Sequence, residues 1–152
     1  MHSPRLLLLN GPNLNLLGER ETAIYGTKTL AELEQSLKHE AESLGYELIC
    51  KQTNSEGDFV DLIQTHRIGM PIQVSGLIIN PAAYTHTSVA IRDAVLASRL
   101  PTVEVHISQL AKREVFRQKS LISDVVLGTV SGFGLYGYTL ALLALVNHLE
   151  DV

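Results

Sequence analysis

The feature that most constrains the fold is the alternation of short apolar runs with longer segments of helical period. The apolar runs predict five strands, at Arg5–Asn10, Glu47–Thr53, Gly76–Asn80, Thr102–His106 and Asp124–Thr129. This alternation is typical of β-α-β units around a parallel sheet. The first, third and fifth runs predict strands that are buried on both faces. We therefore expect an α/β protein with a flavodoxin-like, five-stranded parallel sheet and helices on both faces.

Helices are expected in the gaps between these strands. The first is predicted over residues 30–44, where Thr29 and Glu32 form a capping-box pair. Others are predicted from Thr87 or Ser88 to Ser98 and from about Leu135 to the end of the chain. A length of 152 residues fits one domain, so residues 1–152 are expected to form a single domain.

Composition excludes several classes of partner. The net charge of -4 argues against a nucleic-acid partner, because proteins that bind nucleic acids carry clustered basic faces. A single cysteine, Cys50, permits neither an intramolecular disulfide nor a cysteine cage for a metal, and a reducing cytoplasmic location is expected. The leucines at 6–9 are too few for a signal peptide, and the apolar window at 132–146 is shorter than the ~20 residues that cross a membrane.

Ligands of open parallel sheets bind outside the carboxyl ends of the strands. The first polar residues there are Asn10, Asn54, Asn80 and His106. The long loop after the first strand adds Tyr25 with Arg20 five residues before it, and a cation nearby would favour the phenolate of a tyrosine base. From these residues alone, the simpler interpretation of Tyr25 is a packing tyrosine beside a turn glycine.

The segment after the third strand is rich in polar groups. Thr87 or Ser88 can cap the next helix and leave backbone N–H groups facing an oxygen-rich ligand, near Asn80 and His86. The alternative is that these two residues satisfy local turns. Asp93 lies two turns into this helix. From the sequence alone, it is interpreted as a solvated charge.

The fourth strand ends in a carboxylate and an imidazole. The period of two puts Glu104 and His106 on one face, where the carboxylate can orient the imidazole and favour the protonated form that a general acid needs. A structural histidine is the alternative. Consecutive N–H groups of Ile107 and Ser108 can bind an anion. Arg113 and Arg117, four apart, are predicted on one face of a short following helix, unless they form a solvated basic face.

Other sequence motifs lack the neighbouring residues and elements that their functions require. The glycines at 132, 134 and 137 match a dinucleotide fingerprint, but no second strand follows to supply its acidic residue, so close packing of helix on sheet is the better interpretation. The sequence has no nucleophile elbow, no Walker loop and no His-Glu-x-x-His motif. The remaining histidines are far apart in sequence and give little support to a metal site.

Together the loops closely resemble those of the type II 3-dehydroquinate dehydratases. The resemblance is carried by residues 9–18 (LNGPNLNLLG), 25–26 (YG), 52–57 (QTNSEG), 79–88 (INPAAYTHTS) and 104–108 (EVHIS), and it spans nearly the whole chain. It implies a lyase that converts 3-dehydroquinate to 3-dehydroshikimate through an enolate, with no metal and no organic cofactor. The reaction would serve the shikimate pathway of aromatic amino acid biosynthesis or quinate breakdown.

The resemblance also implies roles for individual residues. Tyr25 would be the base, with Arg20 favouring its phenolate, and His106, oriented by Glu104, would be the acid. Asn13 would hold the water or oxygen on which enolate charge gathers. The implied substrate contacts are Asn80, His86, Ile107, Ser108 and Arg117, with Arg113 as a supporting cation near the tyrosine.

Family members are trimers assembled into dodecamers, so the resemblance implies a homo-oligomer in which Asp93 reaches the site of a neighbouring subunit.

Two rival functions remain open. One is a non-catalytic flavodoxin-like module that binds a flavin or a nucleotide, since fold alone does not fix function. The other is a lyase that acts on a different polyhydroxy acid.

Overall fold

The computed structural model describes residues 2–151, apart from the Ile24 side chain, and it contains one five-stranded parallel sheet. The strands are β1 (Arg5–Asn10), β2 (Glu47–Gln52), β3 (Gly76–Asn80), β4 (Thr102–His106) and β5 (Gly128–Ser131). Their order across the sheet is β2-β1-β3-β4-β5. This is the flavodoxin-like order, which confirms the predicted fold class.

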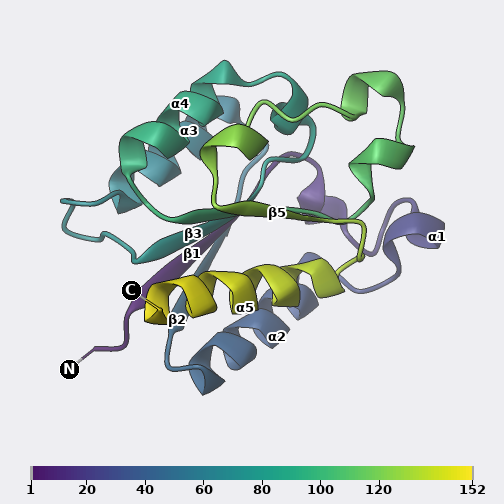
Figure 1. Ribbon diagram of the computed structural model, residues 1–152. Helices are drawn as coiled ribbons and strands as arrows, with labels where there is room; N and C mark the ends of the chain where they lie inside the picture. The colour runs from purple at the N-terminus through teal and green to yellow at the C-terminus, as the bar shows by residue number, and fades with distance from the viewer. Residues whose placement is uncertain (1, 152) are drawn as a thin grey trace.

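Four helices of ten or more residues cover the sheet (Figure 1). They are α2 (Leu30–Ser43), α3 (Glu56–His66), α4 (Val89–Ser98) and α5 (Tyr136–Glu150). Helices α2 and α5 lie on one face, and α3 and α4 lie on the other. The predicted helices are confirmed to within about two residues; Val152, which the last prediction included, lies outside the described residues.

The four leucines of β1 show how the sheet divides its two cores. All four are fully buried, and period two sends them alternately to opposite faces. Leu6 and Leu8 pack in the cluster with α2 and α5, whereas Leu7 and Leu9 pack in the cluster with α3 and α4. A central strand that is buried on both faces therefore appears in the sequence as a continuous apolar run.

The fifth strand departs from its prediction. It was expected at Asp124–Thr129 and buried on both faces, but it lies at Gly128–Ser131 at the edge of the sheet and is largely exposed. Residues Ser123–Val125 instead form a 3-10 turn, and Val125 and Val126 pack against the α3 and α4 core from outside the sheet. Their apolar character reflects this packing and not a strand, and the strand that is buried on both faces besides β1 and β3 is β4.

The helix predicted after β4 is also wrong. The segment contains two separate 3-10 turns, Leu110–Lys112 and Val115–Arg117, so Arg113 and Arg117 do not share a face of one helix.

The glycine motif before α5 fits the packing interpretation. Gly132 and Gly134 take left-handed backbone angles in a turn, and an added Cβ on buried Gly137 would lie 3.4 Å from Val105 on β4.

Within residues 2–151, no helix is both long and apolar enough to cross a membrane. The carboxyl ends of the strands point to the end of the molecule where the short helix α1 (Thr22–Tyr25) and the 3-10 turns after β4 lie (Figure 1). The termini lie at the opposite end. The loops that carry most of the predicted site residues therefore meet at one end of the sheet.

Candidate active site

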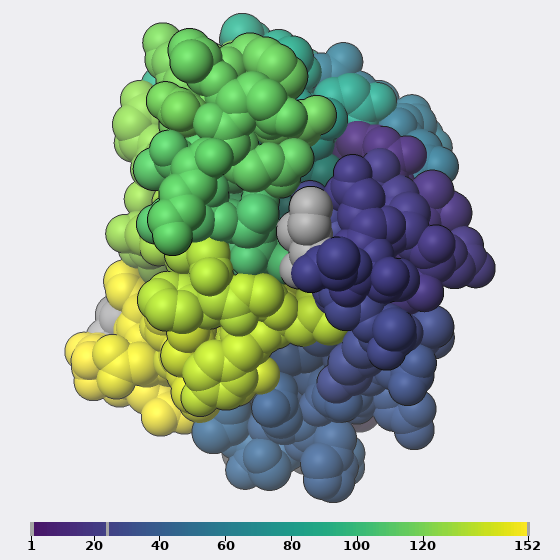
Figure 2. All heavy atoms as spheres, turned by 90° about the vertical axis from the view of Figure 1, so that its right-hand side faces the viewer, coloured from purple at the N-terminus to yellow at the C-terminus, as the bar shows by residue number. Residues whose placement is uncertain are grey.

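A cavity of about 180 Å³ opens at the carboxyl ends of β1, β3 and β4. Figure 2 shows the segment after β1 and the segment after β4 next to each other at this end of the molecule. Ten of the twelve residues that the sequence nominated line this cavity: Asn13, Arg20, Tyr25, Asn80, His86, His106, Ile107, Ser108, Arg113 and Arg117. Of the four residues that the strand-end rule named, Asn80 and His106 line the cavity, whereas Asn10 and Asn54 do not.

The two remaining nominated residues lie outside the lining. Glu104 lies fully buried behind His106, and Asp93 lies exposed on α4. Asp124 contacts the neighbour of Asp93, Arg92, through both of its carboxylate oxygens. Asp93 thus has no part in the pocket of its own chain.

His106 is the most buried of the histidines in the pocket, with 4% of its surface exposed. Its Nε2 contacts the Oε2 of Glu104, as the strand period predicted, while Val103 and Val105 enter the core on the other face. Because a carboxylate only accepts, Nε2 donates in this pair. The ring nitrogen Nδ1 is therefore the one left for other partners.

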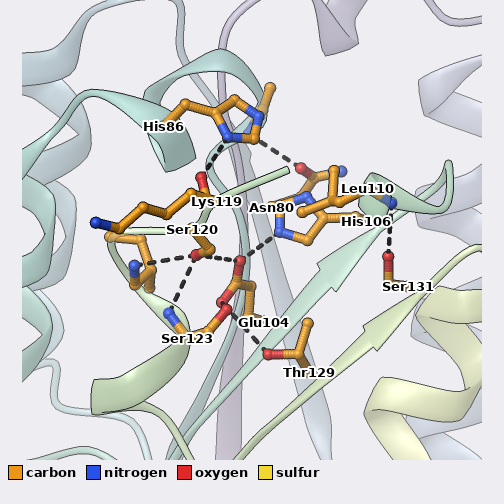
Figure 3. A network of polar contacts seen from close by, with 12 residues as sticks. Asn80, His86, Glu104, His106, Leu110, Lys119, Ser120, Ser123, Thr129 and Ser131 are labelled. Carbon is orange, nitrogen blue, oxygen red and sulfur yellow. Dashed lines mark hydrogen bonds and ion pairs between the residues drawn. The ribbon is translucent and has the colours of Figure 1, made fainter. Parts of the chain in front are cut away.

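Hydroxyl groups surround the carboxylate of Glu104 (Figure 3). Ser120 Oγ donates to Oε2 at 2.9 Å, Ser123 Oγ donates to Oε1 at 2.9 Å, and Thr129 Oγ1 lies 3.4 Å from Oε1. Burial works to raise the pKa of this carboxyl group. The His106 ring and the serine hydroxyls outweigh burial and hold the pKa below its ordinary value, so Glu104 is a carboxylate.

Tyr25 lies at the end of α1 and also lines the pocket. Its phenol oxygen accepts a hydrogen bond from Arg113 Nη1 at 3.2 Å, and the same Nη1 lies 2.8 Å from Ser108 Oγ. Arg20 lines the pocket but makes no hydrogen bond to this phenol among the contacts of the described residues. The family resemblance implied both Arg20 and Arg113 near the tyrosine, and of the two it is Arg113 that contacts the phenol.

A second tyrosine, Tyr138, lies beneath the pocket and has a different environment. It is fully buried, donates to Asn10 Oδ1 at 2.7 Å and accepts from Asn80 Nδ2 at 2.8 Å. Burial raises the pKa of its phenol, so Tyr138 stays protonated. Of the five tyrosines in the sequence, all within the described residues, Tyr25 alone lines the pocket beside a guanidinium.

His86 and Asn13 are held by contacts from neighbouring loops. The Nδ1 of His86 lies 2.8 Å from the carbonyl oxygen of Lys119 and must donate to it, which leaves Nε2 free of this contact. The backbone N–H of Asn13 donates to Asn54 Oδ1 at 3.0 Å, and Gln52 donates to the same oxygen. The strand-end residue Asn54 therefore supports the loop and does not line the pocket.

Sequence reasoning missed the residues that support these side chains. Ser120, Ser123 and Tyr138 each contact a nominated residue from a distant part of the chain, and neither spacing nor composition marks them. It also missed Glu21, which lines the pocket next to Arg20. Among residues 2–151, no group of three or more His, Cys, Asp or Glu side chains is arranged to hold a metal ion.

The sequence profile described as "Dehydroquinase class II" matches residues 4–146. The chain belongs to the class II dehydroquinase family. A 3-dehydroquinate dehydratase of Prochlorococcus marinus is 53% identical over 147 residues, which cover 97% of this chain and 96% of the relative. One of Geotalea daltonii is 51% identical over 96% of this chain and 99% of its own.

Solved structures of the family have the same fold. The type II dehydroquinase of Propionibacterium acnes superposes with a TM-score of 0.88 at 42% identity, covering 96% of this chain and 98% of its own. A dehydroquinase of this type from Butyrivibrio crossotus gives a TM-score of 0.86 at 41% identity, covering 96% and 98%. This class II dehydroquinase therefore has the family's fold over nearly its whole length.

Proposed function

We propose that this class II dehydroquinase converts 3-dehydroquinate to 3-dehydroshikimate and water. The observation that carries the proposal is a pair of groups facing one small pocket. His106 contacts a buried carboxylate, Tyr25 contacts a guanidinium, and both side chains line the same pocket. The names of the relatives support the substrate.

Tyr25 is the proposed base. Its phenolate takes the proton from the carbon beside the ketone, and the electron pair of that C–H bond moves to the ketone oxygen to give an enolate. The hydrogen bond from Arg113 favours the phenolate, because a guanidinium donor stabilises an anionic oxygen more than a neutral one. Arg20 also lines the pocket and adds positive charge where enolate charge develops. Asn13 would hold the water or oxygen on which that charge gathers.

His106 is the proposed acid. The enolate collapses to a conjugated enone as the C–O bond to the β-hydroxyl breaks, and the imidazolium gives its proton to the departing oxygen, which leaves as water. Glu104 holds the ring in position through its contact with Nε2. Exchange with water then returns a proton to His106 and removes one from Tyr25.

The remaining lining residues suit a polyhydroxylated anion. We propose that Asn80, His86, Ile107, Ser108 and Arg117 contact the substrate. The guanidiniums of Arg113 and Arg117 give the pocket the charge that a carboxylate ligand needs. Glu114 holds Arg117 Nε at 3.0 Å on the outer side of this segment.

We also propose a homo-oligomer, a dodecamer of four trimers, in which Asp93 contacts the site of a neighbouring subunit. The exposure of Asp93 on α4, outside the pocket of its own chain, supports such a role. Native mass spectrometry tests the assembly. A monomer at micromolar concentration would overturn it.

The reaction is tested by adding 3-dehydroquinate to purified protein, without added metal or cofactor, and recording ultraviolet absorbance. We expect the absorbance of a conjugated enone to appear. Folded protein that gives no such signal would overturn the proposal. Activity on another hydroxyketone acid in its place would point to a different lyase, and a bound yellow flavin or a retained nucleotide would point to a binding module.

A further inference from the structure

The carboxylate of Glu104 is the most completely occupied acceptor in the described residues. Its Oε2 faces His106 Nε2 and Ser120 Oγ, and its Oε1 faces Ser123 Oγ and Thr129 Oγ1 (Figure 3). A carboxylate offers about four lone-pair sites, and a protonated one would need an acceptor of its own. Donors therefore surround this group, which fits only its ionised form.

The hydroxyl of Ser120 has its orientation fixed. Its oxygen accepts from the backbone N–H of Ile122 at 3.0 Å and from that of Ser123 at 3.1 Å. A hydroxyl has two acceptor sites and one proton. With both acceptor sites occupied, its proton points to Glu104 Oε2 at 2.9 Å.

The segment that carries both serines is held in place independently of Glu104. The carbonyl of Lys119 accepts from His86, and the N–H of Leu121 donates to the carbonyl of Thr85 at 2.8 Å. Two consecutive peptide groups are therefore attached to the turn after β3. The position of this segment is therefore fixed by contacts other than those to Glu104.

We propose that Ser120 and Ser123 are positioning residues for the acid of the dehydration: their hydroxyls hold Glu104 ionised and in the one orientation that directs the His106 ring. This rests on the function proposed above. Ser120 contributes more, because it shares Oε2 with the imidazole and is oriented by two backbone donors. Ser123 is exposed and acts on the other oxygen.

The other charged and titratable groups near this pair belong to other partners. His86, Tyr25, Arg20, Glu21, Arg113 and Arg117 also line the pocket, and no hydrogen bond or ion pair joins any of them to Glu104 among the described residues. Asp124, on the same segment as the serines, is paired with Arg92. Glu104 and His106 thus form a unit whose nearest donors are the serine and threonine hydroxyls.

The first test measures kcat and KM for Ser120→Ala, Ser123→Ala and Ser120→Thr. We expect kcat to fall about 10-fold in Ser120→Ala and less in Ser123→Ala, with KM little changed, because a hydrogen bond to a charged group is lost. Ser120→Thr keeps the hydroxyl and should restore most of kcat. Ser43→Ala removes a serine hydroxyl on α2, far from the pocket, and serves as the matched control.

The decisive arm repeats Ser120→Ala in a Glu104→Gln background. A hydroxyl that acts through Glu104 should have little further effect there, so the two substitutions should be strongly non-additive. A wild-type kcat in both serine variants would overturn the proposal. So would an equal loss from Ser120→Ala in both backgrounds, which indicates general damage to the fold.

A readout without substrate separates this proposal from the proposed function. The donors that keep Glu104 ionised make the folded protein lose stability on acidification, as the pH falls through the lowered pKa of that group. We expect this loss to be smaller in Ser120→Ala and Ser123→Ala than in wild type or Ser43→Ala. An unchanged acid profile would overturn the positioning role, whether or not 3-dehydroquinate proves to be the substrate.

Discussion

Two parts of the pocket lining are built in contrasting ways. One wall, here called the strand wall, consists of Asn80, His106 and Ile107 at the ends of β3 and β4, and all three are buried. The other, the loop wall, consists of Asn13, Arg20, Glu21 and Tyr25, none of which is buried. Asn13 and Glu21 also take left-handed backbone angles that few residues other than glycine adopt.

This difference predicts that the two walls contribute differently to stability and to catalysis. Polar groups of the strand wall are shielded from water and contact buried partners, so a change there leaves a buried partner unsatisfied. Groups of the loop wall are solvated whether or not their partners are present. We therefore expect changes in the strand wall to affect both stability and turnover, and changes in the loop wall to affect turnover alone.

The largest combined effect is expected for His106→Ala. Turnover should fall at least ~100-fold because the proposed acid is lost. The free energy of unfolding should fall by about 3 kcal/mol because Glu104 keeps its buried charge without the imidazole. Steady-state assays and urea unfolding measure the two quantities. If His106→Ala lost turnover but kept the stability of wild type, the proposed difference between the two walls would be wrong.

Tyr25→Phe is the corresponding change in the loop wall. Turnover should again fall at least ~100-fold if the phenol is the base. The free energy of unfolding should change by no more than ~0.5 kcal/mol, since the half-buried phenol loses one hydrogen bond that water can replace. Near-native turnover in this variant would show that Tyr25 is not the base.

Two glycines give a comparison without any catalytic group. An alanine Cβ at Gly11, where β1 ends, would lie 2.5 Å from the carbonyl oxygen of Pro81, so Gly11→Ala should cost about 3 kcal/mol of stability. At Gly26 nothing lies within 4 Å of an added Cβ, but its φ of 80° and ψ of −172° form a combination that glycine alone adopts readily. Gly26→Ala should cost about 2 kcal/mol through this backbone strain alone. Thermal unfolding of both variants measures the difference, and equal costs would contradict it.

The smallest expected effect is on how the free energy of unfolding depends on pH. The pKa of Glu104 is lowered in the folded protein, so its contribution to stability is complete above the ordinary range of a glutamate and is lost as the pH falls through the lowered value. Glu104→Gln lacks this titration. Its free energy of unfolding should therefore fall less than that of wild type between about pH 6 and pH 3. Parallel profiles for the two proteins would assign the acid sensitivity to other carboxylates.

The sequence predicted the fold and the pocket wherever local signals were strong. Continuous apolar runs located β1, β3 and β4, and the capping pair at Thr29 and Glu32 located the start of α2. It failed where a residue's role depends on distant contacts. The valines at 125 and 126 have the composition of a strand, but they pack from a loop, and β5 begins after them.

The same limit applies within the site. His106 and Glu104 were found because they follow one another on a strand, whereas the contact of Tyr25 with Arg113 joins residues 88 positions apart. Spacing pointed to Arg20, which is near in sequence. Only the folded path of the segment after β4 brings the other guanidinium to the phenol.

The phenol of Tyr138 also bears on when the pocket is completed. It joins Asn10 and Asn80, which lie 128 and 58 positions before it, at the ends of the two central strands. During synthesis the amino-terminal strands leave the ribosome first, and domains generally fold as units. Asn80 therefore acquires its partner only once α5 has been made and has docked, so a nascent chain that lacks this helix holds most of the pocket residues without their final support.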